Sequence, residues 1–247
     1  MSKAKIRLCV DQQFGQGQSV RLSEAQAHYL FGVMRARVGS RVLLFNGRDG
    51  EWSAEIAEAG KRKGALTCLE QTRPQSQPPD LWLIFAPVKK ARTDIIVEKA
   101  VELGVARLLP VTTEFTNSER LRRDRAEVHA REAAEQCGAV HVPTVENVVP
   151  LTRLLSKWDP VRRILWADEE LAGEGKPPAE LLAGRPKGPW AILIGPEGGF
   201  SEGERARLRA LPWIQPMALG PRTLRAETAA IAAISLWQAH LGDWAAP

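Results

Sequence analysis

The feature that most constrains this chain is a regular alternation of apolar runs and helical patterns after residue 80. Strands are expected at 81–86, 107–111, 162–167, 190–195 and 214–219, and helices at 93–103, 122–137, 201–210 and 225–240. Continuous apolar strands that alternate with helices form a parallel sheet that is covered on both faces. The sequence therefore predicts an α/β domain over residues 81–247.

The first part of the chain has a different character. Residues 41–45, 52–56 and 64–70 read as short strands, and 23–34 as a short helix with Ser23 as its N-cap. The Asn-Gly and Asp-Gly pairs within 46–50 predict a turn between the first two strands. Residues 74–80 (PQSQPPD) contain three prolines, which neither a helix nor a strand should cross. We expect a small β-barrel domain at 1–73, a linker at 74–80 and the α/β domain at 81–247.

The positive charge of the chain is confined to this first part. The net charge is +5, from 34 Lys and Arg against 29 Asp and Glu. Residues 1–73 hold 12 basic and 7 acidic side chains, whereas residues 74–247 hold 22 of each. A basic first domain suggests a polyanion such as a nucleic acid as partner, although a solvated basic surface has the same composition.

Several classes of protein are disfavoured by absent signals. No stretch reaches the roughly 18–20 apolar residues that span a bilayer, and no apolar run follows the basic residues at the start. We therefore expect no membrane contact and a cytoplasmic location. The three cysteines are far apart and the four histidines form no i,i+4 pair, so we expect neither a disulfide frame nor a metal site. The chain contains no Walker loop, no G-x-G-x-x-G dinucleotide motif and no G-x-S-x-G motif.

Three loops at predicted strand ends are candidates for a binding site, because ligands of open α/β sheets bind beyond the carboxyl ends of the strands. Loop 195–200 (GPEGGF) holds three glycines, whose missing Cβ atoms let a ligand lie against the backbone. Loop 220–228 (GPRTLRAET) holds two arginines and a Glu-Thr pair at the start of a helix, and 168–170 (DEE) is acidic. Adjacent strands would bring such loops into one cleft.

Each loop also has a plainer interpretation. Glycine-rich loops are often only turns, and an acidic run such as 168–170 is commonly a solvated surface. Glu227 can simply favour the dipole of its helix. Without a nucleotide motif, the cleft suits a neutral or cationic ligand held by backbone groups and apolar walls.

Two glycine-bearing motifs resemble those of the RsmE family, which are 16S ribosomal RNA N3-methyluridine methyltransferases of the SPOUT superfamily. They are residues 194–204 (IGPEGGFSEGE) and 219–229 (LGPRTLRAETA). The resemblance covers nearly the whole chain, with further matching segments at 89–104, 114–118, 132–136, 142–143, 28–35 and Gly39. The chain departs from the family near Cys137, where serine is common, and near Thr223, where an aliphatic residue is common.

The resemblance implies a fold, a cofactor and partners. The fold is an N-terminal PUA-like β-barrel followed by a C-terminal SPOUT α/β domain with a parallel sheet and a trefoil knot. S-adenosylmethionine is the implied methyl donor, and a homodimer acting on 16S ribosomal RNA or the small ribosomal subunit is the implied assembly. The implied cofactor-binding residues are Leu165, Ile194, Gly195, Pro196, Gly198, Gly199, Leu219, Gly220, Leu224 and Thr228.

Methyl transfer to N3 of a uridine requires loss of the N3 proton and stabilisation of charge on the uracil oxygens. Arg222 and Arg225 are the candidates for stabilising that charge or for holding phosphate. Glu197 and Glu227 are candidate bases or organisers, with the alternative that Glu227 caps its helix and pairs with Arg225. The expected RNA contacts of the N-terminal domain are Arg7, Arg21, Arg35 and Arg37.

Two other functions remain open from the sequence. One is a non-catalytic RNA-binding ribosome assembly factor with a vestigial pocket. The other is a SPOUT methyltransferase that acts on transfer RNA or on another RNA base.

Overall fold

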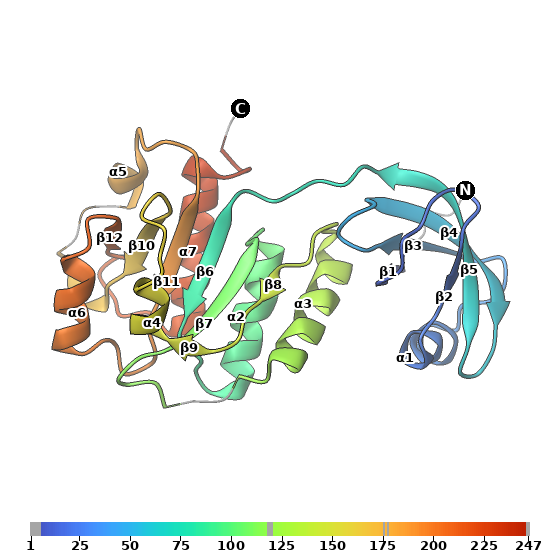
Figure 1. The fold of residues 1–247 in the computed structure, drawn as a ribbon, viewed down its shortest axis with the longest axis horizontal. Helices are drawn as coiled ribbons and strands as arrows, with labels where there is room; N and C mark the ends of the chain where they lie inside the picture. Colours follow the sequence, from blue (N-terminus) through green and yellow to red (C-terminus); the bar gives the residue numbers. More distant parts are fainter. Residues whose placement is uncertain (1–5, 118–120, 175, 177, 246–247) are drawn as a thin grey trace. The chain divides into compact units, whose positions relative to one another are not determined.

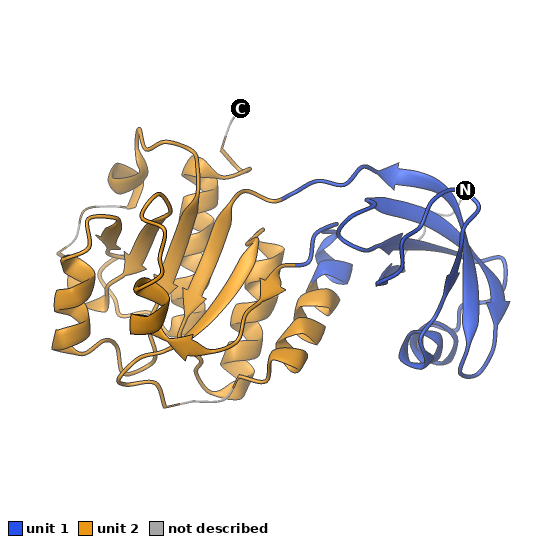
Figure 2. Cartoon of the chain, viewed as in Figure 1, with its two compact units in different colours: residues 1–77, 134–142 blue, residues 78–133, 143–247 orange. Residues whose placement is uncertain are grey.

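The computed structural model describes residues 6–117, 121–174, 176 and 178–245, so that residue 118 of the 114–118 motif lies outside the described residues. The chain divides into two compact units, shown in blue and orange in Figure 2. Unit 1 comprises residues 1–77 and 134–142, and unit 2 comprises residues 78–133 and 143–247. The domain limits expected from the sequence stay a prediction, but residues 134–142 belong with the first part of the chain, which the sequence did not indicate.

Unit 1 is built on a curled five-stranded sheet in the order β1-β3-β4-β5-β2. β1 pairs in parallel with β3, and the other pairings are antiparallel. β1 and β2 are the sheet edges and do not pair with each other in the described ladders, so the expected PUA-like barrel is an open, curled sheet. Its elements are β1 (Arg7–Cys9), β2 (Ser19–Arg21), α1 (Glu24–Ala27), the π-helix η1 (His28–Val33), β3 (Arg41–Phe45), β4 (Glu51–Ala59) and β5 (Gly64–Arg73).

Local sequence signals explain two features of unit 1. Ser23 caps α1 as predicted, because its hydroxyl accepts a hydrogen bond from the Gln26 amide while the Gln26 side chain accepts one from the Ser23 amide. The predicted turn between β3 and β4 is organised by Asn46, whose side-chain oxygen accepts hydrogen bonds from the amides of Arg48 and Asp49. The predicted helix at 23–34 changes to a π-helix after Ala27.

A buried carboxylate ties the start of β4 to its surroundings. Glu51 is 4% exposed and accepts hydrogen bonds from Arg7 at 2.8 Å, from Arg73 at 2.5 and 3.0 Å and from Thr72 at 2.9 Å. Burial alone would raise the pKa of Glu51, but the hydrogen bonds from Arg73, Arg7 and Thr72 outweigh burial and hold that pKa below its ordinary value. Glu51 therefore remains ionised inside the unit.

Unit 2 is built on a seven-stranded sheet in which every pairing is parallel (Figure 1). The strand order is β12-β10-β11-β6-β7-β8, with β9 also paired to β7. The predicted parallel sheet is confirmed, although the sequence did not indicate the two-residue strands β8 and β9. The strands are β6 (Leu81–Phe85), β7 (Arg107–Thr112), β8 (Thr144–Val145), β9 (Val149–Pro150), β10 (Arg163–Ala167), β11 (Trp190–Ile194) and β12 (Ile214–Met217).

Helices cover both faces of this sheet, as predicted. On one face, Leu151 of α4 and Leu208 of α6 join a buried cluster with Ile84, Trp166 and Leu193. On the other, α7 contacts β11 and packs against α2. The helices are α2 (Lys90–Glu102), α3 (Arg123–Cys137), α4 (Leu151–Leu155), the 3-10 helix η2 (Glu169–Leu171), α5 (Pro178–Leu182), α6 (Glu202–Arg209) and α7 (Ala226–Leu241).

Strand pairing sets the position of the candidate site. β10 lies between β11 and β12 and pairs in parallel with both, so the carboxyl ends of all three strands meet at one edge of the sheet. The trefoil knot stays a prediction. Within the described part of the chain, no helix is both long and apolar enough to cross a membrane.

Candidate active site

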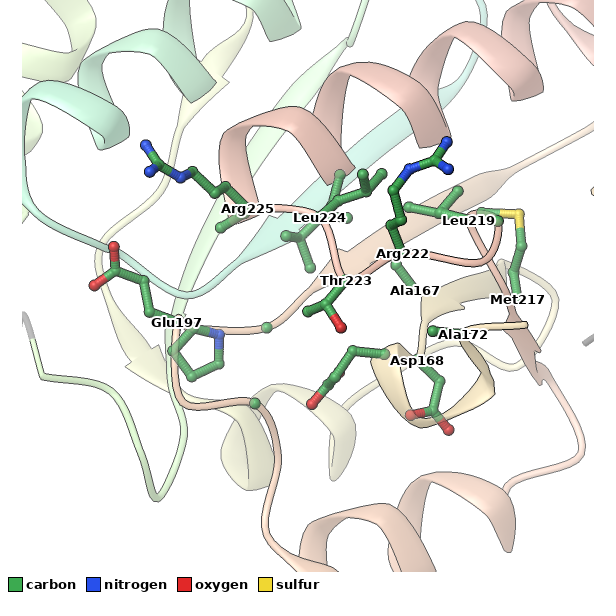
Figure 3. Close-up of a pocket in the computed structure, with 18 of the residues that line it drawn as sticks. Ala167, Asp168, Ala172, Glu197, Met217, Leu219, Arg222, Thr223, Leu224 and Arg225 are labelled. Carbon is green, nitrogen blue, oxygen red and sulfur yellow. The ribbon is translucent and has the colours of Figure 1, made fainter. Parts of the chain in front are cut away.

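The loops that follow β10, β11 and β12 line one cavity of about 290 Å³ (Figure 3). Its lining comes from 167–172, from 194–199 and from 217–226, with Ala229 of α7 and Arg92 of α2 in addition. This volume is close to the lower end of the range for small-molecule sites, roughly 300 Å³. The structure thus brings the two glycine-bearing loops together, as the sequence predicted.

The loop after β11 is shaped by close packing that excludes side chains at two glycines. A Cβ atom on Gly195 would lie 2.6 Å from the ring of Phe200, which itself packs edge-on against Trp166. Gly199 has a φ of +71°, and a Cβ atom there would lie 2.0 Å from Oε1 of Glu169. The glycines are therefore required for the loop to approach Phe200 and the acidic segment.

The same loop ends in a helix cap. The Ser201 hydroxyl accepts a hydrogen bond from the Glu204 amide at 3.3 Å, and the Glu204 carboxylate accepts one from the Ser201 amide at 3.0 Å. These reciprocal bonds form a capping box at the start of α6, where the sequence predicts a helix from residue 201. Glu204 also accepts a hydrogen bond from the Glu114 amide at 3.0 Å, which connects the cap to the loop after β7.

The loop after β12 carries the two predicted arginines. Gly220, with a φ of +98°, makes the turn after β12, and the Arg222 and Arg225 side chains extend to opposite sides of the loop (Figure 3). Both arginines line the cavity and are exposed. Among the described residues neither forms an ion pair with a carboxylate, so the alternative pairing of Arg225 with Glu227 is not observed.

Arg92 of α2 reaches the cavity and contacts two of the predicted carboxylates. Its guanidinium forms a hydrogen-bonded ion pair with Glu197, and its Nε lies 3.6 Å from Oε1 of Glu227. The other oxygen of Glu227, Oε2, is buried and has no hydrogen-bond partner within the described part of the chain. Three segments distant in sequence therefore meet at Arg92.

The acidic segment 168–170 is only partly solvated, because its first residue is buried. Asp168 is 2% exposed and forms ion pairs with Arg205 and, at 3.1 Å, with Arg209. Arg205 is itself buried, pairs also with Glu169, and donates a hydrogen bond to the Phe200 carbonyl at 3.0 Å. Hydrogen bonds to Asp168 and Glu170 raise the pKa of Arg209. These contacts fix the loop after β10 against α6, because two cations balance the buried charge.

Most of the residues expected to bind the cofactor line this cavity. Leu165 lies buried within β10, Gly198 packs beside Phe115, and Thr228 is exposed on the first turn of α7, so these three lie outside the lining. The expected residues within the lining are Ile194, Gly195, Pro196, Gly199, Leu219, Gly220 and Leu224. Of the four catalytic candidates, Glu197, Arg222 and Arg225 line the cavity, and Glu227 reaches it only through Arg92.

Sequence reasoning left out several lining residues. Asp168, Glu169 and Thr223 lie within the predicted loops but outside the expected cofactor-binding set. Ala167 and Met217 each lie two residues from an expected position and could have been included by extending the loops. Arg92 carried a weaker signal. It belongs to the 89–104 motif, and α2 follows β6, which pairs with β11, but no local spacing links it to the strand-end loops.

The four arginines expected to contact RNA differ in how far their side chains are exposed. Arg21, Arg35 and Arg37 are exposed on unit 1. The Arg7 side chain is only 11% exposed, because it pairs with Glu51 and donates hydrogen bonds to the carbonyls of Ala134, Glu135 and Ala139. We therefore correct the expectation that Arg7 contacts RNA, because its side-chain donors form hydrogen bonds within unit 1.

The described residues offer no cluster of three or more His, Cys, Asp or Glu side chains suited to a metal ion. The polar groups of the cavity are instead carboxylates, guanidinium groups and the backbone of the three loops.

Comparison with known proteins connects this geometry to a family. Residues 75–238 match the family model of an RNA methyltransferase domain, and residues 22–67 match that of an RNA methyltransferase PUA domain. Proteins named ribosomal RNA small subunit methyltransferase E are similar over most of the chain. The one from Rickettsia conorii is 28% identical, covering 93% of each chain, and the one from Bacillus subtilis is 28% identical, covering 91% of each.

Solved structures agree with this match. The ribosomal RNA small subunit methyltransferase E of Neisseria gonorrhoeae, bound to S-adenosyl methionine, has a TM-score of 0.84 at 27% identity, covering 97% of this chain and 99% of its own. A putative methyltransferase of Legionella pneumophila in complex with SAM has a TM-score of 0.86 at 27% identity, covering 98% of this chain and all of its own. The motif resemblance to the RsmE proteins is confirmed, and the chain belongs to the RNA methyltransferase family.

Proposed function

We propose that the protein transfers a methyl group from S-adenosylmethionine to N3 of a uridine in the 16S ribosomal RNA of the small subunit. The observation that carries this proposal is the single cavity formed by the loops after β10, β11 and β12. That cavity lies in a chain of the RNA methyltransferase family, and structures of the same fold were solved with S-adenosylmethionine bound.

The residues of the cavity suit this methyl donor. Ile194, Met217, Leu219 and Leu224 supply apolar walls, and the glycine backbones leave room for close approach. When bound, S-adenosylmethionine supplies a methyl group on a positively charged sulfur.

Different side chains of the cavity have different roles in the reaction. The uracil N3–H is a weak acid, so a group within hydrogen-bond reach must accept its proton. Of the two candidate bases, we assign this role to Glu197, because it lines the cavity and Glu227 does not. The guanidinium groups of Arg222 and Arg225 lie at the cavity without a carboxylate partner among the described residues, and they stabilise negative charge on the uracil oxygens as the proton leaves.

RNA binding is assigned to unit 1 together with the rim of the cavity. Unit 1 contains the PUA domain match, and its exposed Arg21, Arg35 and Arg37 are suited to phosphate contacts. A base held in a stacked helix cannot reach into a cavity between loops, so the target uridine enters from a single-stranded or unstacked position.

We further propose that the enzyme acts in the cytoplasm as a homodimer, which the family resemblance implies. Light scattering of the purified protein should give twice the mass of one chain. The monomeric mass at micromolar concentration would contradict the dimer without affecting the proposed chemistry.

The test of the function is labelled methyl transfer to small subunits purified from a strain that lacks the modification, followed by mass analysis of nucleosides. We expect the label in 3-methyluridine of 16S ribosomal RNA. Label in a different nucleoside, or in transfer RNA, would favour a related methyltransferase with another target. Binding to RNA without any transfer would favour an assembly factor.

A further inference from the structure

Arg92 is a cavity residue that the proposed roles leave without a task. It lies in the first turn of α2, its side chain is 30% exposed, and it lines the cavity. Its guanidinium pairs with Glu197 on the loop after β11 and lies 3.6 Å from Glu227 on the first turn of α7. One side chain from a helix therefore contacts both candidate bases.

Glu197 needs such a partner to stay at the cavity. The backbone around Glu197 is held by a turn in which the Gly199 amide donates a hydrogen bond to the Pro196 carbonyl at 3.0 Å, but this bond does not reach the Glu197 side chain. Its side chain is 35% exposed, so packing alone does not fix the carboxylate. Arg92, in contrast, is held on a helix whose first turn is closed by Thr93, whose side chain exchanges hydrogen bonds of 3.0 and 2.9 Å with the Val88 backbone.

Glu227 fixes Arg92 from the other side. The Glu227 side chain is 14% exposed, and its Oε2 has no hydrogen-bond partner among the described residues. A buried carboxylate is costly unless a nearby cation balances it, and Arg92 is the cation that the structure places there. Moving Arg92 away would leave Glu227 unbalanced, so Glu227 restrains the guanidinium near the cavity.

We propose that Arg92 is a positioning residue that holds the Glu197 carboxylate at the cavity, with Glu227 as the anchor of Arg92. This inference rests on the proposed function, in which the N3–H bond breaks and the proton passes to Glu197. The electron pair left on N3 forms the new bond to the methyl carbon, and the sulfur of the donor keeps the electron pair of the bond that breaks. A carboxylate that leaves the cavity cannot accept the proton, so loss of Arg92 slows turnover while the apolar walls remain.

The experiment is a double-mutant cycle on the full chain with Arg92→Gln, Glu197→Gln and the combination of both. Turnover is measured with small subunits as substrate, and donor affinity by calorimetry with S-adenosylmethionine. We expect Glu197→Gln to lower kcat by about 100-fold or more. Arg92→Gln should lower kcat by at least ~10-fold and donor affinity by less than ~3-fold. The double variant should be no slower than Glu197→Gln, because both substitutions remove the same positioned carboxylate from the reaction.

Three further variants separate positioning from folding. Arg92→Lys keeps the positive charge and should restore much of the lost turnover. Glu227→Gln removes the charge that anchors Arg92 and leaves Arg92 itself unchanged. It should lower kcat in the wild-type background but cause no further loss when combined with Glu197→Gln. Lys99→Gln is the matched control, because Lys99 also lies on α2 and also pairs with two carboxylates, Glu98 at 2.7 Å and Glu102 at 2.8 Å. It should leave turnover within about twofold of the wild type.

The outcomes distinguish this inference from the function on which it rests. A wild-type protein that transfers no methyl group would refute the proposed function. An active wild type with unchanged turnover in Arg92→Gln, or with additive effects in the double variant, would overturn the role of Arg92 and leave the proposed methyl transfer intact. Unchanged turnover in Glu197→Gln would overturn both the role of Arg92 and the assignment of Glu197 as the base. Equal losses of donor affinity and turnover in Arg92→Gln would also overturn it, since Arg92 would then be a wall of the cofactor site. If Arg92→Gln fails to fold, Glu227→Gln decides by the same criteria.

Discussion

At Gly199, the backbone conformation and the nearest side chain both exclude a Cβ atom. The φ of +71° is left-handed, and Oε1 of Glu169 occupies the space that a methyl group would need. The sequence could identify this glycine as unusual because three glycines cluster in the loop. It could not show that Glu169, thirty residues earlier in the chain, is the reason.

Gly199→Ala should lower the free energy of unfolding by about 1–2 kcal/mol, the cost of a left-handed conformation for a side-chain-bearing residue. It should also weaken binding of S-adenosylmethionine, because Glu169 must leave its place at the cavity. Urea unfolding and calorimetry measure the two effects. Gly203→Ala is the control, because Gly203 lies in α6 with no atom within 4 Å of the new Cβ. Alanine favours a helix more than glycine does, so this substitution should slightly raise the free energy of unfolding. Similar results for both variants would contradict this account of Gly199.

Arg205→Met should destabilise the protein by about 3 kcal/mol, because it leaves the buried Asp168 with only Arg209 to balance its charge. Urea unfolding measures the loss. Arg207→Ala changes an exposed arginine on the same helix, and should alter stability by less than ~0.5 kcal/mol. Equal values for the two variants would show that the ion pairs with Asp168 contribute nothing.

At the scale of the elements, periodicity predicted those strands and helices that are long enough to show it. The strands at 41–45 and 81–86 and the long helices of unit 2 were found to within a few residues. β1 and β2, with three residues each, and the two-residue β8 and β9 are too short for an alternating pattern. The burial of Asp168 was missed because its cause is a pair of arginines on α6, far along the sequence.

The first residue of β4 gives the fold a dependence on pH. The pKa of Glu51 is lower in the folded than in the unfolded chain. The contribution of Glu51 to the free energy of unfolding is therefore present above the unfolded pKa of 4.5 and is lost as the pH falls through the folded pKa. The difference in unfolding free energy between the wild type and Glu51→Gln should be largest at neutral pH and shrink steadily below pH 4.5. Urea unfolding at several pH values measures it. A difference that stays constant with pH would argue against the contribution of the Arg7 and Arg73 contacts.

At the scale of the whole molecule, composition and fold divide the chain in nearly the same place. The excess positive charge lies in residues 1–73, and all residues that line the cavity belong to unit 2. Charge counting could therefore separate a candidate RNA-binding part from a candidate cofactor-binding part. It could not reveal that residues 134–142 complete unit 1, because that assignment depends on contacts such as those of Arg7.

Replacing Arg21, Arg35 and Arg37 together by Gln should weaken RNA binding and flatten its dependence on salt. If each contacts one phosphate of single-stranded RNA, the slope of log K against log salt concentration should decrease by about 2. Fluorescence anisotropy with a 16S ribosomal RNA fragment measures the slope, and Lys187→Gln on unit 2 serves as the control. An unchanged slope in the triple variant would place the phosphate contacts elsewhere.

The assignment of residues 134–142 to unit 1 has a consequence for how the protein is made. During translation, residues 1–77 leave the ribosome well before the segment that supplies carbonyl partners for Arg7 and Arg73. At roughly 5–20 residues per second, that segment follows several seconds later. Until that segment has been synthesised, unit 1 lacks the carbonyl groups that accept hydrogen bonds from the guanidinium of Arg7. By then the first strands of unit 2 have also been made. Nascent chains stalled shortly before residue 134 should therefore be more sensitive to proteases in β1 than chains stalled well beyond residue 142.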